Sequence, residues 1–430
     1  MRMSRLVLVS APGALSTCQD PVGGGVRILE LLAGRWAGRH EVVVLTAGSR
    51  DGEEEIGGVR QVRLGLPSLA GGPERRLLDF GAFAYARFSE EFEKRATAWL
   101  LERASGVPVL CNDIAEGPDF GRLADAGFRM VTLFHVVVAD FFSRIYLRDW
   151  VKPAQVGRLL DSLRRWRLSV LVPRIPRLVF QKEGRAVARS AALVVPSTGM
   201  ADALAGAFPA IDRSRLHVIP WGWNEESPPE AEVAGAEAEL REEYHLDGDA
   251  RVVMTLSRLS HEKGIELLLS ALERLEGQAG PRITALVCGA GAYMGGADYV
   301  RRLQRQAAGL RRARVIFPGY LTGARKAAHF RLAHLFVNCS RYEAYGLAIA
   351  EALRAGLPVL SADHYGSRDL VRAPYGEIVA RRDAGEFAAR LAALLADPAA
   401  LAGRGLAARE AGAGLSFAAA ADRIEGLLLG

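Results

Sequence analysis

The stretch from Ser340 to Leu360, SRYEAYGLAIAEALRAGLPVL, holds two carboxylates, Glu343 and Glu351, on either side of Gly346. It follows an apolar run of strand character, residues 332–340, and its second half has helical composition. The predicted order is strand, loop, helix, with Glu343 in the loop and Glu351 inside the helix. The helix N-terminus between them has N–H groups without partners and a positive dipole end, which suit a phosphate.

The chain has 430 residues, 50% of them apolar, which is too long for one ordinary core and suits two α/β domains. We predict a first domain over residues 1–224 and a second over residues 250–412. The acidic, Ala- and Pro-rich residues 225–249 are predicted to link them. Residues 413–430 are predicted to form a helix that packs back toward the first domain.

Membrane-spanning and secretory features are weak. No uncharged apolar run approaches the roughly 20 residues that cross a bilayer, and residues 5–10 are predicted to form a buried strand rather than part of a signal peptide. The cysteines show no paired spacing, which favours reduced thiols in a cytoplasmic protein. They are Cys18, Cys111, Cys288 and Cys339.

The first half opens as strand, helix, strand, with a glycine-rich turn at Gly23–Gly25. Its spacing does not match G-x-G-x-x-G, so a nicotinamide site is disfavoured, and the turn either brings its backbone to a ligand or is simply flexible. His135 follows a buried strand at residues 129–134. The carboxyl ends of parallel strands hold ligands in open α/β sheets, so His135 is either structural or a ligand contact.

Basic residues gather between Ser143 and Arg189, twelve of them against three acidic residues. One interpretation is an arginine-rich solvated face. The other is peripheral contact with an anionic membrane, at its inner face, because Trp150 and Trp166 lie among these charges. Nucleic acid is not expected as a partner, since no recognition motif accompanies the charge.

Two cations, Arg258 and Lys263, follow the first predicted strand of the second half. Together with the helix start at Gly346 they would converge on a diphosphate and neutralise a leaving nucleotide without a metal. Glu351 is suited to accept hydrogen bonds from a ribose diol, and Glu343 from hydroxyls of a transferred sugar. We therefore expect no metal and no cofactor.

These motifs resemble the retaining glycosyltransferases of family 4, which have the GT-B fold of two facing Rossmann-like domains. The matching segments of the second half are SRLSHEKGIELLLSAL, LVCGAG, VIFPGYL and SRYEAYGLAIAEALRAGLPVLSAD. Those of the first half are VGGGVRILELLAGRWAGRHEVVVLT, VTLFH, VVPST and VIPWGWN. The resemblance covers nearly the whole chain.

The resemblance implies that Arg258 and Lys263 bind the donor diphosphate, Glu351 the ribose and Glu343 the sugar. His135 would contact the sugar from the first domain, and it counts with Arg258, Lys263 and Glu343 as a catalytic candidate. The other implied donor-binding residues are glycines, strand ends and a helix start: Gly24, Gly25, Gly289, Tyr320, Leu321, Tyr345, Gly346 and Leu347.

The activity implied by the resemblance is transfer of a sugar, with retention, from a nucleotide-diphosphate sugar to a hydroxyl of a glycan, a lipid-linked molecule or a small molecule. Ser257, Asn224, Cys339 and the segment DHYGSRDL depart from the family's usual pattern. A phosphorylase or disaccharide synthase on the same scaffold, and a catalytically silent sugar-nucleotide binder, stay open as alternatives. The sequence does not specify the base, the sugar, the acceptor or the oligomeric state.

Overall fold

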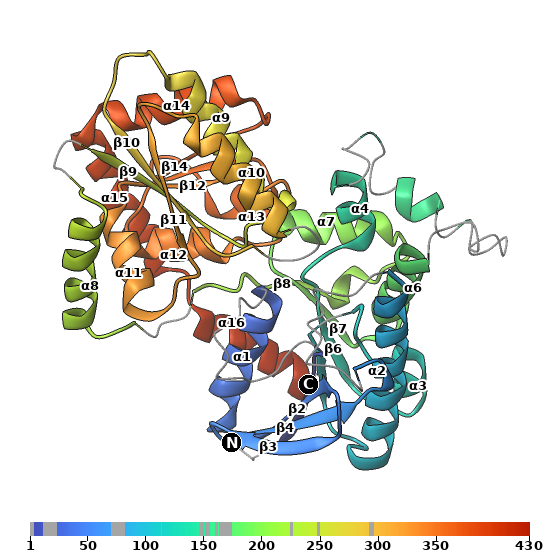
Figure 1. Ribbon diagram of the computed structural model, residues 1–430. Helices are drawn as coiled ribbons and strands as arrows, with labels where there is room; N and C mark the ends of the chain where they lie inside the picture. The colour runs from blue at the N-terminus through green and yellow to red at the C-terminus, as the bar shows by residue number, and fades with distance from the viewer. Residues whose placement is uncertain are drawn as a thin grey trace. The chain divides into compact units, whose positions relative to one another are not determined.

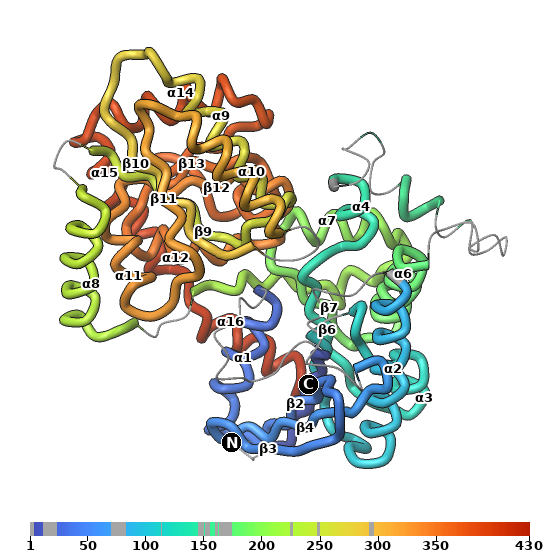
Figure 2. Tube along the Cα trace, viewed as in Figure 1, coloured from blue at the N-terminus to red at the C-terminus, as the bar shows by residue number. Residues whose placement is uncertain are grey.

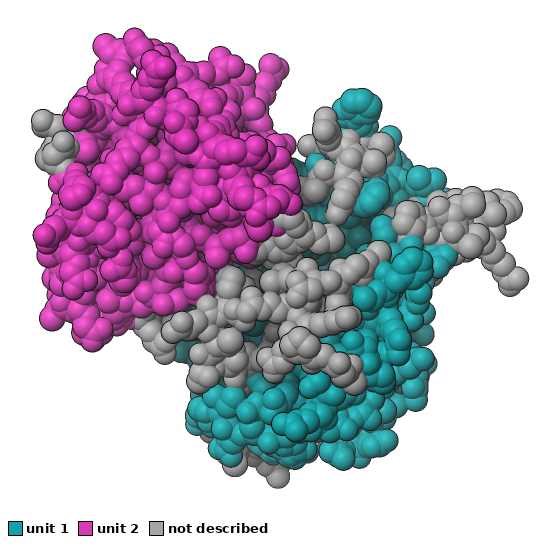
Figure 3. Space-filling view, viewed as in Figure 1, with its two compact units in different colours: residues 1–221, 418–430 teal, residues 222–417 magenta. Residues whose placement is uncertain are grey.

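The computed structural model describes residues 4–11, 24–69, 82–112, 114–145, 150, 155–159, 162, 174–223, 227–246, 250–291 and 296–430. Cys18, Gly23, Trp166 and Asn224 lie outside these residues. The chain divides into two compact units, Met1–Trp221 with Ala418–Gly430, and Gly222–Phe417 (Figures 1 and 3). Each unit contains its own sheet.

The sheet of unit 1 has eight strands in the order β3-β4-β2-β1-β5-β6-β7-β8, and all neighbours are parallel except β3 and β4. Its central strands are short apolar runs buried along their length, as expected for a parallel sheet covered on both faces. The strands β2 to β4 lie on one side of β1, and the strands from β5 onward lie on the other side. The strands are β1 (Arg5–Val9), β2 (Glu41–Gly48), β3 (Gly52–Ile56), β4 (Val59–Gly65), β5 (Val109–Cys111), β6 (Met130–Leu133), β7 (Ala192–Val195) and β8 (Leu216–Val218).

Several helices of unit 1 bury apolar side chains. In α1 (Gly24–Ala37) the buried residues recur at helical spacing, from Val26 to Trp36. The other helices are η1 (Pro67–Leu69), α2 (Ala82–Arg103), α3 (Phe120–Asp125), α4 (Val138–Ile145), α6 (Arg174–Arg189), α7 (Thr198–Ala207) and η4 (Arg213–Arg215). The last helix of the chain, α16 (Phe417–Leu429), lies beside α1 in unit 1 (Figure 2).

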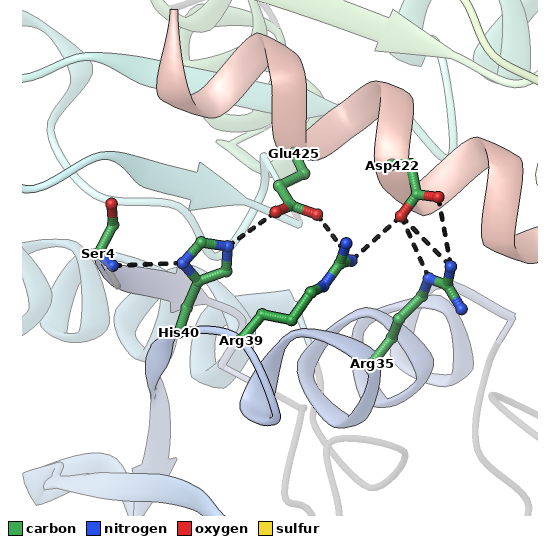
Figure 4. Close-up of polar contacts among 6 residues, drawn as sticks. All are labelled: Ser4, Arg35, Arg39, His40, Asp422 and Glu425. Carbon is green, nitrogen blue, oxygen red and sulfur yellow. Dashed lines mark hydrogen bonds and ion pairs between the residues drawn. The ribbon is translucent and has the colours of Figure 1, made fainter. Parts of the chain in front are cut away.

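A polar cluster joins α16 to the α1–β2 corner (Figure 4). His40 Nδ1 accepts a hydrogen bond from the Ser4 amide at 3.3 Å, so Nε2 carries the hydrogen and donates to Glu425 Oε1 at 2.7 Å. Arg39 also pairs with Glu425, at 2.7 Å, and bridges to Asp422 at 3.1 Å. The His40 side chain is fully buried and that of Glu425 is 5% exposed, which makes their hydrogen bond costly to lose.

The sheet of unit 2 has six strands in the order β11-β10-β9-β12-β13-β14, all parallel. β9 and β12 are neighbours, although nearly 80 residues separate them in sequence. The strands are β9 (Arg251–Leu256), β10 (Ile283–Cys288), β11 (Arg314–Gly319), β12 (Leu335–Asn338), β13 (Val359–Ala362) and β14 (Gly376–Val379). The helices are η5 (His261–Lys263), α9 (Glu266–Leu275), α10 (Gly296–Ala308), α11 (Gly323–Leu332), α12 (Leu347–Ala355), α13 (Tyr365–Leu370), α14 (Ala384–Ala396) and α15 (Pro398–Ala413).

The segment 225–249, expected to be a linker, instead contains a helix of unit 2, α8 (Glu230–Glu243), which packs on α11. Its buried residues, Val233, Ala236 and Leu240, form one narrow stripe at helical spacing. The surrounding Glu and Ala residues favour a helix, and their acidity conceals the stripe in the overall composition. Residues 247–249 lie outside the described part of the chain.

Three of the cysteines, Cys111, Cys288 and Cys339, are buried free thiols. Burial raises the pKa of Cys111 and of Cys339 to about 12, so both remain protonated at neutral pH.

Among the residues that the structure describes, no single helix is long and apolar enough to cross a membrane. α14 and α15 satisfy the length and composition only as a pair, and they are bent by 98°.

Candidate functional site

The charged residues predicted to bind the diphosphate and the sugar follow β9 and β12, the two neighbours at which the strand order reverses. Arg258 and Lys263 come after β9, and Glu343 and Gly346 come after β12. Because the strands are parallel, these residues share one edge of the sheet, at the kind of reversal where open α/β sheets hold ligands. Lys263 Nζ lies 2.5 Å from Glu343 Oε2, so the structure brings this predicted pair into contact.

The Lys263–Glu343 pair is largely shielded from solvent, with side chains 11% and 22% exposed. Burial by itself would raise the pKa of Glu343, but the ammonium of Lys263, with smaller effects of His364 and Arg258, holds that pKa below its ordinary value. Glu343 is therefore an anion at neutral pH. Arg258 extends the positive charge of this edge and lies 3.7 Å from Glu262 Oε1.

Gly346 forms the N-cap of α12 with φ at +97°, a left-handed conformation that favours glycine. Its carbonyl accepts hydrogen bonds from the Ile349 and Ala350 amides at 2.9 and 3.1 Å. The Leu347 amide is the first N–H group of α12, a position that has no intrahelical acceptor. This helix start therefore has the geometry that suits an anion.

Gly366, at the start of α13, supports the loop that carries Glu343, and it was not among the predicted residues. Its amide donates to the Glu343 carbonyl at 3.1 Å, and a Cβ at this position would lie 1.7 Å from the Tyr345 carbonyl oxygen. Only a glycine permits this approach. It falls in the segment DHYGSRDL, where the glycine itself was the available signal.

Glu351 is not in contact with the Lys263–Glu343 pair in the structure; its Oε1 accepts from Lys326 Nζ of α11 at 2.8 Å. Lys326 was not predicted, since its position three residues into a helix resembles that of an ordinary surface lysine. The pair is partly exposed, at 33% and 30% of the two side chains. Glu351 is thereby oriented by a cation from the neighbouring helix.

The remaining predicted donor positions have local structural roles. The Tyr345 side chain is buried and its hydroxyl accepts from the Gly222 amide at 2.9 Å, so a part in donor binding would fall to its backbone. A Cβ at Gly289 would lie 1.8 Å from the Ser257 carbonyl oxygen, where β9 and β10 end side by side. Tyr320 is exposed and Leu321 buried, both just after β11.

In unit 1, predicted residues meet where the strand order reverses between β1 and β5. Gly24 and Gly25 begin α1, and His135 follows β6. Asn112, which was not predicted although it directly follows the buried strand β5, connects them. Its Nδ2 donates to the Gly25 carbonyl at 3.0 Å, and its Oδ1 lies 3.1 Å from His135 Nε2.

The basic segment 143–189 uses much of its described charge within unit 1. Lys182 is buried, and its ammonium donates to two carbonyl oxygens and a hydroxyl and pairs with Glu93 at 2.9 Å. Ion pairs also link Arg144 with Asp140, Arg174 with Glu90, and Arg189 with Asp125. Trp150, in contrast, is 90% exposed.

Comparison with known proteins finds relatives of the second half of the chain. Residues 236–410 match the family model described as Glycosyl transferases group 1. The chain is 34% identical over 220 residues, 50% of its length and 51% of the relative, to the D-inositol 3-phosphate glycosyltransferase of Xylanimonas cellulosilytica. It is 32% identical over 183 residues, 40% and 46% of the two chains, to the GDP-mannose-dependent alpha-(1-6)-phosphatidylinositol monomannoside mannosyltransferase of Mycolicibacterium smegmatis. The chain thus spans about half the length of these curated relatives.

Solved structures match over the full length at low identity. Sucrose-phosphate synthase of Thermosynechococcus elongatus superposes with a TM-score of 0.70 at 20% identity, over 99% of this chain and 98% of that one. Anabaena HepE, solved with UDP and glucose, gives a TM-score of 0.68 at 17% identity, over 99% of both chains. These likenesses confirm the predicted GT-B fold. The second half of the chain is thus similar to group 1 glycosyltransferases, and the whole chain has their kind of fold.

Proposed function

We propose that the protein transfers a sugar from a nucleotide-diphosphate sugar to an acceptor hydroxyl, with retention at the anomeric carbon. The observation that carries this proposal is the Lys263–Glu343 ion pair at the strand-order reversal of unit 2, with Arg258 and the α12 N-terminus at the same edge. Cations and helix amides fixed in advance at one edge are what the charge of a departing diphosphate requires.

Each residue has a distinct part in the proposed reaction. Arg258, Lys263 and the Leu347 amide bind the diphosphate and stabilise its charge as the bond to the sugar breaks. Glu343 holds Lys263 at the strand edge and, as an anion, accepts hydrogen bonds from sugar hydroxyls. Glu351, oriented by Lys326, accepts from the ribose. The two cations and the helix N-terminus supply the positive charge, so the reaction proposed needs no metal.

The comparisons support a nucleotide sugar as donor. HepE structures contain UDP or UDP-glucose, and the mycobacterial relative is named for GDP-mannose. Thermal-shift measurements with UDP, GDP, ADP and dTDP test the donor class, because a ligand present at about 100 times its Kd stabilises the folded state by about 2.7 kcal/mol. We expect one nucleotide to raise the Tm of the wild type and to have a smaller effect on Lys263→Ala. No shift with any nucleotide, or equal shifts in both proteins, would contradict the proposed site.

A phosphorylase on the same scaffold is separated from a transferase by the direction of the reaction. Incubation with the donor and candidate acceptors should release nucleoside diphosphate, whereas a phosphorylase would consume a glycoside only in the presence of phosphate. A silent nucleotide-sugar binder would show the thermal shift with neither reaction.

We further propose that the protein acts in the cytoplasm and contacts the anionic inner face of the membrane through residues 143–189. Trp150 and Leu159 are 90% and 58% exposed, which suits insertion among headgroups. The names of two of the matched relatives contain a lipid, phosphatidylinositol monomannoside in one and alpha-monoglucosyldiacylglycerol in the other. Vesicles of phosphatidylglycerol and phosphatidylcholine should sediment the wild type at low salt and Trp150→Ser less. Equal sedimentation with vesicles of phosphatidylcholine alone would exclude the electrostatic contact.

A further inference from the structure

Lys263 and Glu343 stand on separate loops of unit 2, one after β9 and the other after β12. The last described pair of the β9–β12 ladder is Phe336 with Met254, which comes before either loop begins. The 2.5 Å contact between the two side chains therefore depends on what joins the loops beyond the ladder.

Arg382 joins the two loops from a third segment, between β14 and α14. Its Nη1 donates to the Cys339 carbonyl at 2.5 Å, and its Nη2 donates to the Gly264 carbonyl at 3.4 Å. Cys339 begins the loop that carries Glu343, and Gly264 directly follows Lys263. A Cβ at Gly264 would lie 2.6 Å from the Cys339 carbonyl oxygen, so the two backbones are close together where Arg382 bridges them.

The position and the shape of Arg382 suit this bridge. The next residue, Asp383, caps α14 by accepting from the Glu386 amide at 2.8 Å, and α14 packs on α9 just beyond Gly264 (Figure 1). The backbone of Arg382 is therefore anchored beside both loops. A guanidinium is planar and presents its two NH₂ groups at a fixed spacing, so it can hold two carbonyl oxygens at a set distance, whereas a lysine offers one nitrogen.

Arg341 supplies further links between the same loops. Its amide donates to the Glu262 carbonyl at 2.8 Å, and its Nη2 donates to Glu266 Oε1 at 2.7 Å. Loss of Arg382 should therefore loosen the two loops rather than separate them.

We propose that Arg382 is a positioning residue, which braces the loops after β9 and β12 so that Lys263 and Glu343 keep their contact. The hydrogen bonds described for Arg382 run to backbone carbonyls of these loops, so it acts through the pair and not by touching the reacting groups. This inference rests on the proposed function in taking the pair to face the donor diphosphate.

The first test measures how accessible Lys263 is and needs no activity. The full chain is acetylated briefly with an N-hydroxysuccinimide ester, and the modification of each lysine is followed by mass spectrometry. A lysine must leave its carboxylate before it reacts, so we expect Lys263 to react at least about tenfold faster in Arg382→Ala than in the wild type. Lys326, which is paired with Glu351 away from Arg382, is the internal reference and should not change.

Two further variants control this measurement. Arg390→Ala removes another arginine of α14, one whose side chain is 56% exposed and pairs with Glu377, and it should leave the Lys263 rate as in the wild type. Arg382→Lys keeps the charge with one nitrogen and should give an intermediate rate, and it decides the matter if Arg382→Ala does not fold. A Lys263 rate in a folded Arg382→Ala or in Arg382→Lys equal to that of the wild type would overturn the proposal.

Kinetics show whether Arg382 acts through Lys263. We expect Arg382→Ala to lower kcat by about 10- to 10²-fold, because a displaced cation meets the diphosphate poorly. The double variant with Lys263→Ala should then be about as slow as Lys263→Ala alone, since residues that act as a unit are not additive. Losses that multiply, as for an independent structural effect, would contradict the proposal. Faster labelling of Lys263 in Arg382→Ala, in a protein that transfers sugar from no donor, would support the brace and refute the proposed function instead.

Discussion

Substitution of Lys263 by alanine tests the charge arrangement of the candidate site. Lys263 is 11% exposed, so solvent screens its charge little. A unit charge about 4 Å from a phosphate contributes about 4 kcal/mol at an effective dielectric constant of about 20. Loss of one such stabilising group typically costs 10²–10³-fold in kcat, and Glu343 would remain as an anion beside the diphosphate. We therefore expect Lys263→Ala to reduce kcat by roughly 10²–10³-fold.

Lys326→Ala is the matched control. Lys326 also pairs with a glutamate of unit 2, at 2.8 Å compared with 2.5 Å for Lys263. It lies on α11, however, and its partner is Glu351, the residue predicted to bind the ribose. We expect its kcat to stay within about threefold and its donor KM to rise, as for a loss of uniform binding. Steady-state release of nucleoside diphosphate measures both variants. A well-folded Lys263→Ala with kcat within about threefold of the wild type would show that Lys263 does not stabilise the departing diphosphate.

Stability gives an independent readout of the same substitution. The lowered pKa of Glu343 contributes stability at neutral pH, which is lost as the pH falls through the folded-state pKa. Lys263→Ala removes the main cause of that lowering. The difference in unfolding free energy between the two proteins should therefore be largest near neutral pH and shrink in acid.

Three further substitutions test individual contacts. Burial, aided by the charge of Asp140, raises the pKa of Glu183 to about 8. Ionisation of Glu183 therefore opposes folding increasingly as the pH rises from about 4.5 toward 8. Glu183→Gln should raise the Tm at pH 8 and change it little at pH 4.5. Gly366→Ala places a Cβ 1.7 Å from the Tyr345 carbonyl oxygen, so it should lower the unfolding free energy by about 1–3 kcal/mol and weaken donor binding. In the control Gly403→Ala no atom lies within 4 Å of the new Cβ, so this variant should be as stable as the wild type or more stable. Equal urea midpoints for the two variants would contradict this. His40→Ala leaves Oε1 of the buried Glu425 without its donor, although Arg39 still pairs with Oε2. It should lower the unfolding free energy by about 2 kcal/mol in urea titration, against less than about 0.5 kcal/mol for Arg87→Ala, whose side chain is exposed.

Much of the arrangement of the candidate site could be predicted because it depends on local order and on one rule of topology. The strand, loop and helix around Glu343 follow from apolar periodicity and from Gly346. Lys263 and Glu343 are 80 residues apart in sequence, but both follow parallel strands, and the carboxyl ends of neighbouring parallel strands share an edge. The contact between them is a consequence of that arrangement.

Other features depend on tertiary neighbours that the sequence does not reveal. Lys326 pairs with Glu351 only because α11 lies beside α12. Asn112 and Gly366 are ordinary loop residues until the backbones of Gly25 and Tyr345 approach them. Lys182 was expected to belong to a charged surface, but it is buried and donates to carbonyl oxygens.

We propose that a nucleotide diphosphate binds at the edge formed by β9 and β12 of unit 2. Titration calorimetry with the preferred nucleoside diphosphate and its monophosphate tests this directly, because the second phosphate is the group assigned to Arg258 and Lys263. We predict that the wild type and Lys326→Ala bind the diphosphate at least about tenfold more tightly than the monophosphate, a difference of about 1.4 kcal/mol, and that Lys263→Ala loses this preference. An undiminished preference in a well-folded Lys263→Ala would contradict the claim.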